Sequence, residues 1–150
     1  MLGGGSAGGQ LATMAALDGQ VNDPGDDTTV STRAVALVLF NPAYQTDDDP
    51  RLEPFGFSAG AFPPAIMFFG SADHWKNAGD SCYEELTRGG ATVQLWVAPG
   101  QTHGFFNKKG WNESTCREAA LFLHQRGLSA APEDPVPASY ALIRRAATKK

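Results

Sequence analysis

Three short apolar runs most strongly restrict the fold that this chain can adopt. They lie at residues 34–40, 65–69 and 91–98 and are rich in valine, leucine and aromatic side chains. Continuous runs of this length are typical of strands buried on both faces, as in a parallel sheet. Helical patterns occur beside them, listed in chain order as 8–17, 76–88 and about 114–126. The sequence therefore predicts an α/β fold in which an open parallel sheet is flanked by helices.

A glycine-rich stretch near the N-terminus has the pattern G-x-S-x-G, with Ser6 between Gly4 and Gly8. A serine presented between a strand and a helix requires a tight, strained turn, and bulk beside it would clash with the crossing backbone. The short stretch alone is equally consistent with a flexible glycine-rich start. Its interpretation depends on the rest of the chain.

Two further polar residues follow predicted strands: Asp73 after the second apolar run and His103 after the third. The carboxyl ends of parallel strands meet at one edge of a sheet, so Ser6, Asp73 and His103 are expected to lie together. A serine hydroxyl needs a general base, and an imidazole base needs an acceptor that orients it. Of the other two histidines, His74 is expected to point away from Asp73, and His124 to lie on a helix surface. The remaining candidate acids are expected to be solvated, namely Asp47, Asp48, Asp49, Asp80, Glu84 and Glu85.

Three segments together resemble the acetylesterase/lipase group of α/β-hydrolases, which includes hormone-sensitive-lipase-like and BD-FAE-like carboxylesterases. They are GGSAGGQLA at 4–12, FGSAD at 69–73 and HGFFN at 103–107. The serine, acid, histidine order also agrees with that family. The resemblance covers roughly residues 1–127.

The resemblance implies a role for each matching residue. Ser6 would be the nucleophile, His103 the general base and then acid, and Asp73 the orienting carboxylate. The backbone N–H of Ala7 would be one oxyanion donor. The implied reaction is hydrolysis of a short acyl ester, of a small molecule or a carbohydrate, through an acyl-enzyme. No cofactor or metal is expected.

The chain also departs from the family. The family carries an HGGG-type oxyanion loop upstream of the serine, and no such motif occurs here. Only Met1 and Leu2 precede the glycines. The resemblance therefore predicts a partial fold, a fragment that lacks the N-terminal strands, exposes an apolar edge and one face of the first helix, and has little activity alone.

Two domain-level expectations follow. Residues 1–127 are predicted to form the C-terminal part of a hydrolase domain. Residues 128–150 are predicted to be an Ala/Pro-rich and basic tail, with a short helix at 138–148. Two other functions stay open: a serine peptidase of the prolyl-oligopeptidase type, although no propeller repeat is visible, and a non-catalytic hydrolase remnant.

Composition adds few restrictions. A net charge of −4 over 150 residues argues against nucleic acid as a partner. No apolar run reaches 18 residues, so no membrane span is predicted. Cys82 and Cys116 form no metal or C-x-x-C pattern; free thiols are the simplest interpretation and a disulfide stays open. Residues 18–33 are expected to be a surface loop, and the aromatics of 43–62 either line a pocket or pack. Oligomeric state and localisation are left open.

Overall fold

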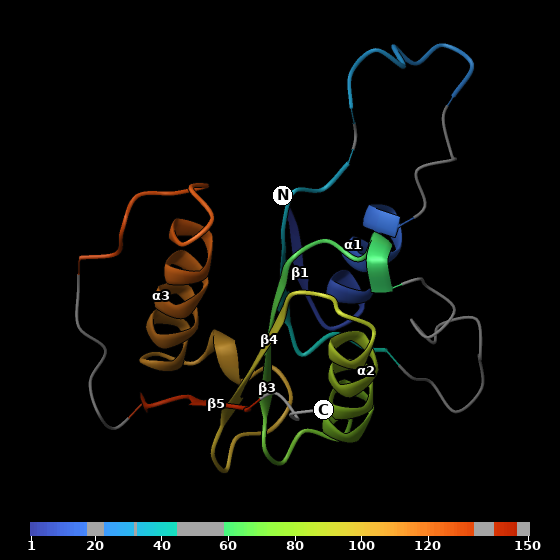
Figure 1. The fold of residues 1–150 in the computed structure, drawn as a ribbon. Helices are drawn as coiled ribbons and strands as arrows, with labels where there is room; N and C mark the ends of the chain where they lie inside the picture. The colour runs from blue at the N-terminus through green and yellow to red at the C-terminus, as the bar shows by residue number, and fades with distance from the viewer. Residues whose placement is uncertain (18–22, 32, 45–58, 134–139, 147–150) are drawn as a thin grey trace.

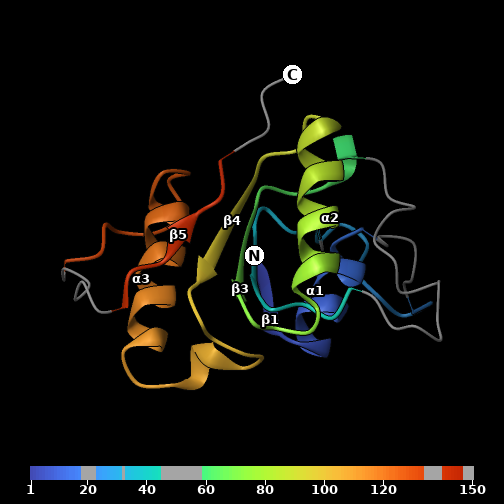
Figure 2. The same ribbon diagram turned by 90° about the horizontal axis from the view of Figure 1, so that it is seen from below.

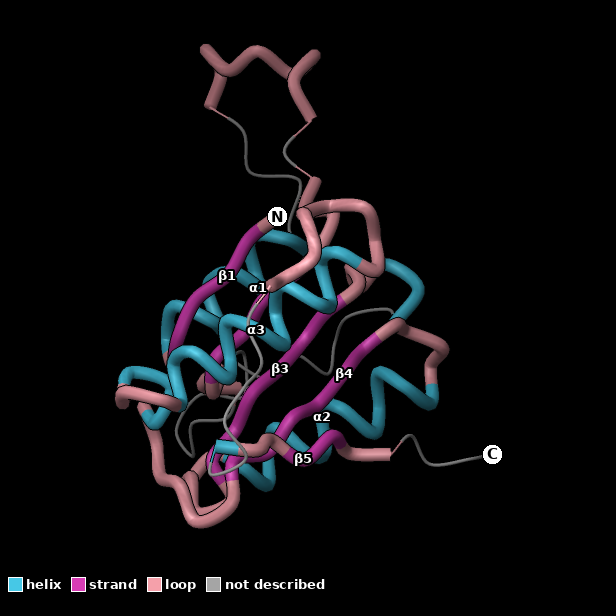
Figure 3. Tube along the Cα trace, turned by 90° about the vertical axis from the view of Figure 1, so that its left-hand side faces the viewer, coloured by secondary structure: helices cyan, strands magenta, loops and turns pink. Residues whose placement is uncertain are grey.

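The computed structural model describes residues 1–17, 23–31, 33–44, 59–133 and 140–146. One sheet runs through it in the order β1-β2-β3-β4-β5. The first four strands are parallel and the last is antiparallel to its neighbour. Figure 3 shows β1 and β5 at opposite edges of this sheet. The strands are β1 (Leu2–Gly5), β2 (Leu37–Phe40), β3 (Ala65–Gly70), β4 (Val93–Ala98) and β5 (Ile143–Arg144).

Helices cover both faces of the sheet, which confirms the predicted α/β class (Figures 1 and 2). Helices α1 (Ala7–Leu17) and α2 (Lys76–Arg88) lie on one face, and α3 (Trp111–His124) lies on the other. Two short 3-10 helices, η3 (Ala59–Ala61) and η4 (Phe105–Asn107), lie in the connections.

Alternate strand residues supply two separate cores. Toward α1 and α2 the buried strand side chains are those of Leu37, Leu39, Ala65, Met67, Phe69, Val93 and Leu95. Toward α3 they are those of Ile66, Phe68 and Ala98, which join Phe105 and Phe122. All six residues of β3 are buried. The continuous apolar run at 65–69 therefore forms a central strand, and both of its faces are covered.

The second strand is shorter than the sequence suggests. It begins at Leu37 rather than at residue 34, and Val35 is 57% exposed. Leu37 pairs with Ala65, and the two residues before Ala65 are Pro63 and Pro64. Proline has no N–H, so the ladder cannot extend further in that direction.

Helix α1 is buried on one side only. Gly9, Gln10 and Thr13 are buried, but Leu11 is 64% exposed and Met14 36%. The described elements that α1 contacts, β1 and β2, lie on its inner side. The apolar side chains on its outer face and Leu2 of the edge strand β1 are open to solvent. This exposure agrees with the exposed apolar edge and helix face that the sequence predicts.

Helix α3 begins at Trp111, three residues earlier than predicted. The N-cap residue is Gly110, which has a φ of 83° and donates its backbone N–H to the Glu113 carboxylate. A left-handed backbone at this point favours glycine.

The predicted helix at 138–148 is wrong over residues 140–146. This segment instead adds β5 to the sheet, and the Arg145 N–H donates to the Leu95 carbonyl over 2.8 Å. The Arg145 guanidinium pairs with Asp80 and Glu84 of α2, so these two acids are not merely solvated as expected. Tyr140 packs edge-on against Trp111, with ring centroids 5.6 Å apart.

The cysteines and the loops are also the subject of predictions. Cys82 and Cys116 are both free, and Cys82 is buried whereas Cys116 is exposed. Residues 23–31 are exposed, as expected of a surface loop. Asp47, Asp48, Asp49 and the Phe55–Phe57 cluster lie outside the described residues. None of the described helices is both long and apolar enough to cross a membrane.

Candidate active site

Ser6 lies in the sharp turn between β1 and α1. Its φ is 55°, a left-handed conformation that is uncommon for serine. Its N–H donates to the Phe40 carbonyl over 2.9 Å, and its own carbonyl accepts the N–H groups of Gly9 and Gln10. These bonds hold the strained backbone in place and leave the hydroxyl at the start of α1, where unpaired N–H groups gather.

The crowding expected around Ser6 falls on Gly4 but not on Gly8. A Cβ on Gly4 would lie 2.4 Å from the Gly8 carbonyl carbon, whereas a Cβ on Gly8 would meet no atom of the described residues within 4 Å. Gly9 is the second crowded position, because a Cβ there would lie 3.0 Å from both the Gly4 oxygen and the Pro42 Cβ. The helix backbone therefore crosses β1 at Gly4 and packs on Pro42 at Gly9.

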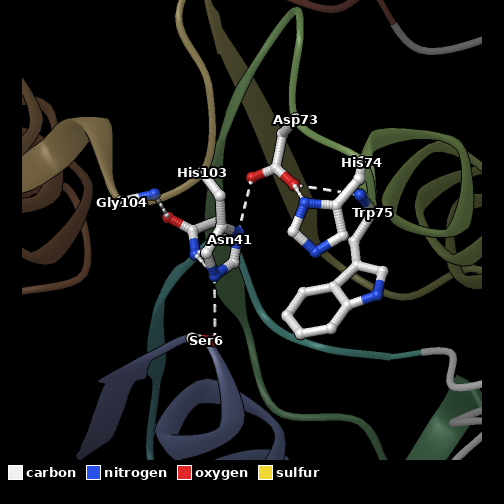
Figure 4. Close-up of polar contacts among 7 residues, drawn as sticks. All are labelled: Ser6, Asn41, Asp73, His74, Trp75, His103 and Gly104. Carbon is white, nitrogen blue, oxygen red and sulfur yellow. Dashed lines mark hydrogen bonds and ion pairs between the residues drawn. The ribbon is translucent and has the colours of Figure 1, made fainter.

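The structure brings the three predicted site residues together (Figure 4). The His103 Nε2 lies 2.9 Å from the Ser6 Oγ, and the His103 Nδ1 lies 3.0 Å from the Asp73 Oδ2. The Asp73 side chain has no exposed surface, and its Oδ1 accepts the Trp75 backbone N–H over 2.9 Å. A carboxylate can only accept, so Nδ1 carries the imidazole proton and Nε2 is left to accept from the serine.

The residues reach one another because each follows a different parallel strand. Ser6 comes directly after β1, Asp73 after β3 and His103 after β4. All three strands point the same way, so their carboxyl ends share one edge of the sheet.

A fourth residue at this edge, Asn41, is not predicted from the sequence. It directly follows β2, is completely buried and has a φ of 36°. Its Nδ2 lies 3.1 Å from each ring nitrogen of His103, and its Oδ1 accepts the Gly104 N–H over 3.3 Å. The sequence does contain a signal for it, because a polar residue follows this apolar run as Asp73 and His103 follow the other two.

The expectation that His74 points away from Asp73 is wrong. Its Nδ1 lies 3.8 Å from the Asp73 Oδ1, and its ring lies 4.9 Å from that of His103, centroid to centroid. In the turn at 73–75 the Trp75 N–H donates to the Asp73 carboxylate, and this turn also places His74 beside the site. The His74 side chain is 61% exposed. Trp75 meets the His103 ring edge-on at 4.9 Å. His124, as expected, is exposed on α3.

Donor atoms of Asp73, His74 and His103 lie within 4.8 Å of one another, and nitrogen and carboxylate oxygen are ligands that zinc accepts. His103 and Asp73 already hydrogen bond to each other. A metal bound between them would have to displace the proton of this bond. The arrangement is that of an oriented base rather than of a vacant cation site.

The site therefore contains a serine hydroxyl, an imidazole in hydrogen-bond contact with it, and a buried carboxylate that orients the imidazole. This arrangement can transfer a proton from a serine hydroxyl as the oxygen attacks an acyl carbon. A hollow lined by residues of 26–35 and 60–64, with Ala16 and Leu17, includes none of these side chains.

The fold is similar to solved structures of an esterase. Thermogutta terrifontis esterase 2 phosphorylated by paraoxon matches with a TM-score of 0.75 and 28% sequence identity, over 87% of this chain and 55% of that chain. Its propionate-bound form matches with a TM-score of 0.73 and 28% identity, over 87% and 57%. Its butyrate-bound form matches with a TM-score of 0.74 and 28% identity, over 87% and 58%.

No protein-family model matches the sequence, and neither does any curated protein. The structural similarity shows that the chain has part of an α/β-hydrolase fold of the kind found in esterases. The chain spans little more than half the length of the solved esterase chains that it matches.

Proposed function

We propose that this chain carries the catalytic residues of a serine carboxylesterase that hydrolyses short acyl esters. Ser6 is the nucleophile, His103 the general base and then acid, and Asp73 the orienting carboxylate. The observation that carries the proposal is the continuous hydrogen-bonded chain from the Ser6 Oγ through His103 to a fully buried Asp73 carboxylate.

The first half of the reaction forms an acyl-enzyme. As the Ser6 oxygen attacks the ester carbonyl, its proton passes to the His103 Nε2, and Asp73 stabilises the imidazolium through Nδ1–H. The carbonyl oxygen becomes an oxyanion, which the Ala7 N–H at the start of α1 can stabilise. The tetrahedral intermediate collapses, the C–O bond to the alcohol breaks, and His103 gives its proton to the departing alkoxide.

The second half repeats these steps with water. His103 accepts a proton from the water as its oxygen attacks the acyl carbon, and then returns a proton to Ser6 as the acid leaves. The enzyme is regenerated and no cofactor is consumed.

Short acyl chains are supported by the structural similarity. The esterase that this fold resembles was solved with propionate and with butyrate, and also as a paraoxon-phosphorylated form. We extend that acyl class to this chain as part of the proposal. Alcohols of small molecules and of carbohydrates both fit the reaction.

The 150-residue chain alone should turn over slowly. Its sequence contains no HGGG-type segment, so Ala7 is the oxyanion donor that we can assign. Loss of one oxyanion donor costs on the order of 10²–10³ in rate. Deacylation also passes through an oxyanion and should be slowed as well. With a nitrophenyl ester, whose leaving group departs readily, acylation is the faster half, so that an acyl-enzyme accumulates.

The proposal is tested by incubating the chain with p-nitrophenyl propionate, butyrate and laurate, and with an aminoacyl p-nitroanilide. We expect slow release of nitrophenol from the two short esters, together with acylation of the Ser6 peptide detected by mass spectrometry. Ser6→Ala should abolish both. The proposal is wrong if ester release is unchanged in Ser6→Ala, if the anilide is cleaved faster than the esters, or if Ser6 is never acylated. The second result would favour a peptidase and the third a non-catalytic remnant.

A further inference from the structure

We propose that Asn41 is a positioning residue that fixes the His103 imidazole relative to Ser6. This inference deepens the proposed function and rests on it. It assigns a role to the fourth polar residue at the carboxyl edge of the sheet, the one that follows β2.

The Asn41 amide lies over the face of the imidazole. Both in-plane directions of the ring are already used, Nδ1 toward Asp73 and Nε2 toward Ser6. A group 3.1 Å from both ring nitrogens cannot lie in the plane beyond either of them, so the Asn41 Nδ2 lies against the ring face. There it blocks tilting of the ring without competing for either catalytic hydrogen bond. Figure 4 shows Asn41 overlapping the His103 ring in this way.

The orientation of the amide is set by the loop that carries His103. The Gly104 N–H donates to the Asn41 Oδ1 over 3.3 Å, which turns Nδ2 toward the ring. Asn41 thus contacts both the side chain of His103 and the backbone of the next residue. Trp75 meets the same ring edge-on. The imidazole is therefore held by Asn41, Trp75 and its two hydrogen-bond partners.

The same turn also holds the serine. The Phe40 carbonyl accepts the Ser6 N–H over 2.9 Å, and the Ala43 N–H donates to the Ser6 carbonyl over 3.2 Å. Asn41 lies between these two residues and donates its own N–H to the Phe68 carbonyl over 2.7 Å. One short turn after β2 therefore binds the nucleophile through its backbone and the base through its side chain, which sets the distance between them.

The burial and backbone of Asn41 support this role. A completely buried amide in a left-handed conformation needs compensation from its surroundings. Glycine would adopt the backbone with less strain, so the contacts of the side chain are what asparagine adds at this position.

The test uses Asn41→Gly, which removes the side chain while tolerating the positive φ, and Asn41→Asp, which keeps the shape and the Gly104 acceptor. Thr13→Val is the matched control, because Thr13 is also buried and hydrogen bonded, but to the Gly9 carbonyl and the Tyr44 hydroxyl and not to Ser6, Asp73 or His103. Two quantities are measured on folded protein: the second-order rate of Ser6 labelling by a fluorophosphonate across pH, and the ¹⁵N imidazole signals of the three histidines.

We expect Asn41→Gly to slow Ser6 labelling by about ten- to a hundredfold, since small displacements of a reacting group cost rates of this order. The His103 ¹⁵N signals should change from a single Nδ1–H tautomer to exchange-averaged values. In Asn41→Asp the acid limb of the labelling profile should move to higher pH, because a carboxylate against the ring favours the charged imidazole. Thr13→Val should change the rate less than twofold.

The positioning role is wrong if Asn41→Gly leaves both the labelling rate and the His103 signals as they are, or if Thr13→Val changes them equally. Failure of the proposed function has a different signature, namely no Ser6 labelling in the unaltered chain. The His103 tautomer still tests the role of Asn41 in that case, because that signal requires no reaction.

Discussion

The His103 Nε2 lies 2.9 Å from the Ser6 Oγ although 97 positions separate the two residues in the sequence. Two strands, β2 and β3, lie between the strands that carry them, so the loop after β4 must pass over the ends of both. Glycines permit this passage. Gly100 and Gly104 have φ values of 69° and 74°, and a Cβ on Gly70 would lie 2.1 Å from the Gln101 carbonyl oxygen. The contact between His103 and Ser6 thus depends on the order of the strands in the sheet and on three glycines.

A pair of glycine substitutions tests the packing of the elbow. Gly4→Ala should lower the free energy of unfolding by about 1–3 kcal/mol, because its Cβ would meet the Gly8 backbone and not a side chain that can move. Gly8→Ala should leave stability unchanged or raise it by up to about 1 kcal/mol, since it fills open space in a helix. Urea unfolding measures both. Equal losses in the two variants would contradict the crossing of the backbones at Gly4.

The two cysteines should differ sharply in reactivity. Burial, with a smaller contribution from Glu85, raises the pKa of the Cys82 thiol to about 12, and Cys116 is exposed. One thiol should therefore react with a disulfide reagent in the folded chain at about pH 8, and two after unfolding in urea. Cys116→Ser is the control and should leave no reactive thiol in the folded state. Rapid reaction of folded Cys116→Ser would show that Cys82 is not shielded.

Stability should decline at alkaline pH. Burial raises the pKa of the Tyr44 hydroxyl well above its ordinary value of 10.0, and the pKa of Cys82 rises from 9.0 to about 12. Both groups hold their protons more tightly when folded, so the stability that they contribute is complete below about pH 9 and is lost as pH rises toward the folded pKa values. Urea unfolding at a series of pH values should show this fall.

Tyr44→Phe separates the tyrosine from the cysteine in that decline. The variant loses the hydrogen bond with Thr13, and should lose about 1 kcal/mol near neutral pH. Its stability should then fall less steeply than that of the unaltered chain above about pH 10, because one of the two titrating groups is gone. Parallel curves would mean that Tyr44 does not titrate on unfolding.

Arg145 should contribute modestly to docking of the last described segment. Arg145→Gln removes the ion pairs with Asp80 and Glu84, but the Arg145 side chain is 32% exposed and water screens these charges. We expect a loss of up to about 1 kcal/mol that shrinks at high salt. Arg88→Gln, an exposed arginine at the end of α2, makes the same charge change and should have a smaller effect. Equal losses would indicate an effect of net charge alone.

Patterns along the chain predicted those features that depend on local periodicity. Lys76–Arg88 has a clear apolar side and two terminal glycines, and α2 has those bounds. The places of Asp73 and His103 after two apolar runs, and of Ser6 in a strand-to-helix turn, sufficed to predict that the three lie together, because parallel strands share an edge. The features that the patterns missed depend on contacts that local periodicity does not encode.

Two examples illustrate this difference. Residues 143 and 144 form a strand because β4 offers them an open edge, and nothing in their own sequence shows that edge. His74 turns toward Asp73 because the Trp75 N–H binds the same carboxylate, a bond between neighbours that the sequence alone does not specify.

The most direct test of the assembled site is labelling of the 150-residue chain with a fluorophosphonate, followed by mass spectrometric mapping of the modified peptide. Phosphonylation needs an activated serine, but not the turnover that a full oxyanion site supports. We expect a single label on Ser6. Labelling should be about 10²–10⁴-fold slower in His103→Ala and in Asp73→Asn, because the base is missing in one and held in the wrong tautomer in the other. A label on another residue, or equal labelling of all three proteins, would contradict the account.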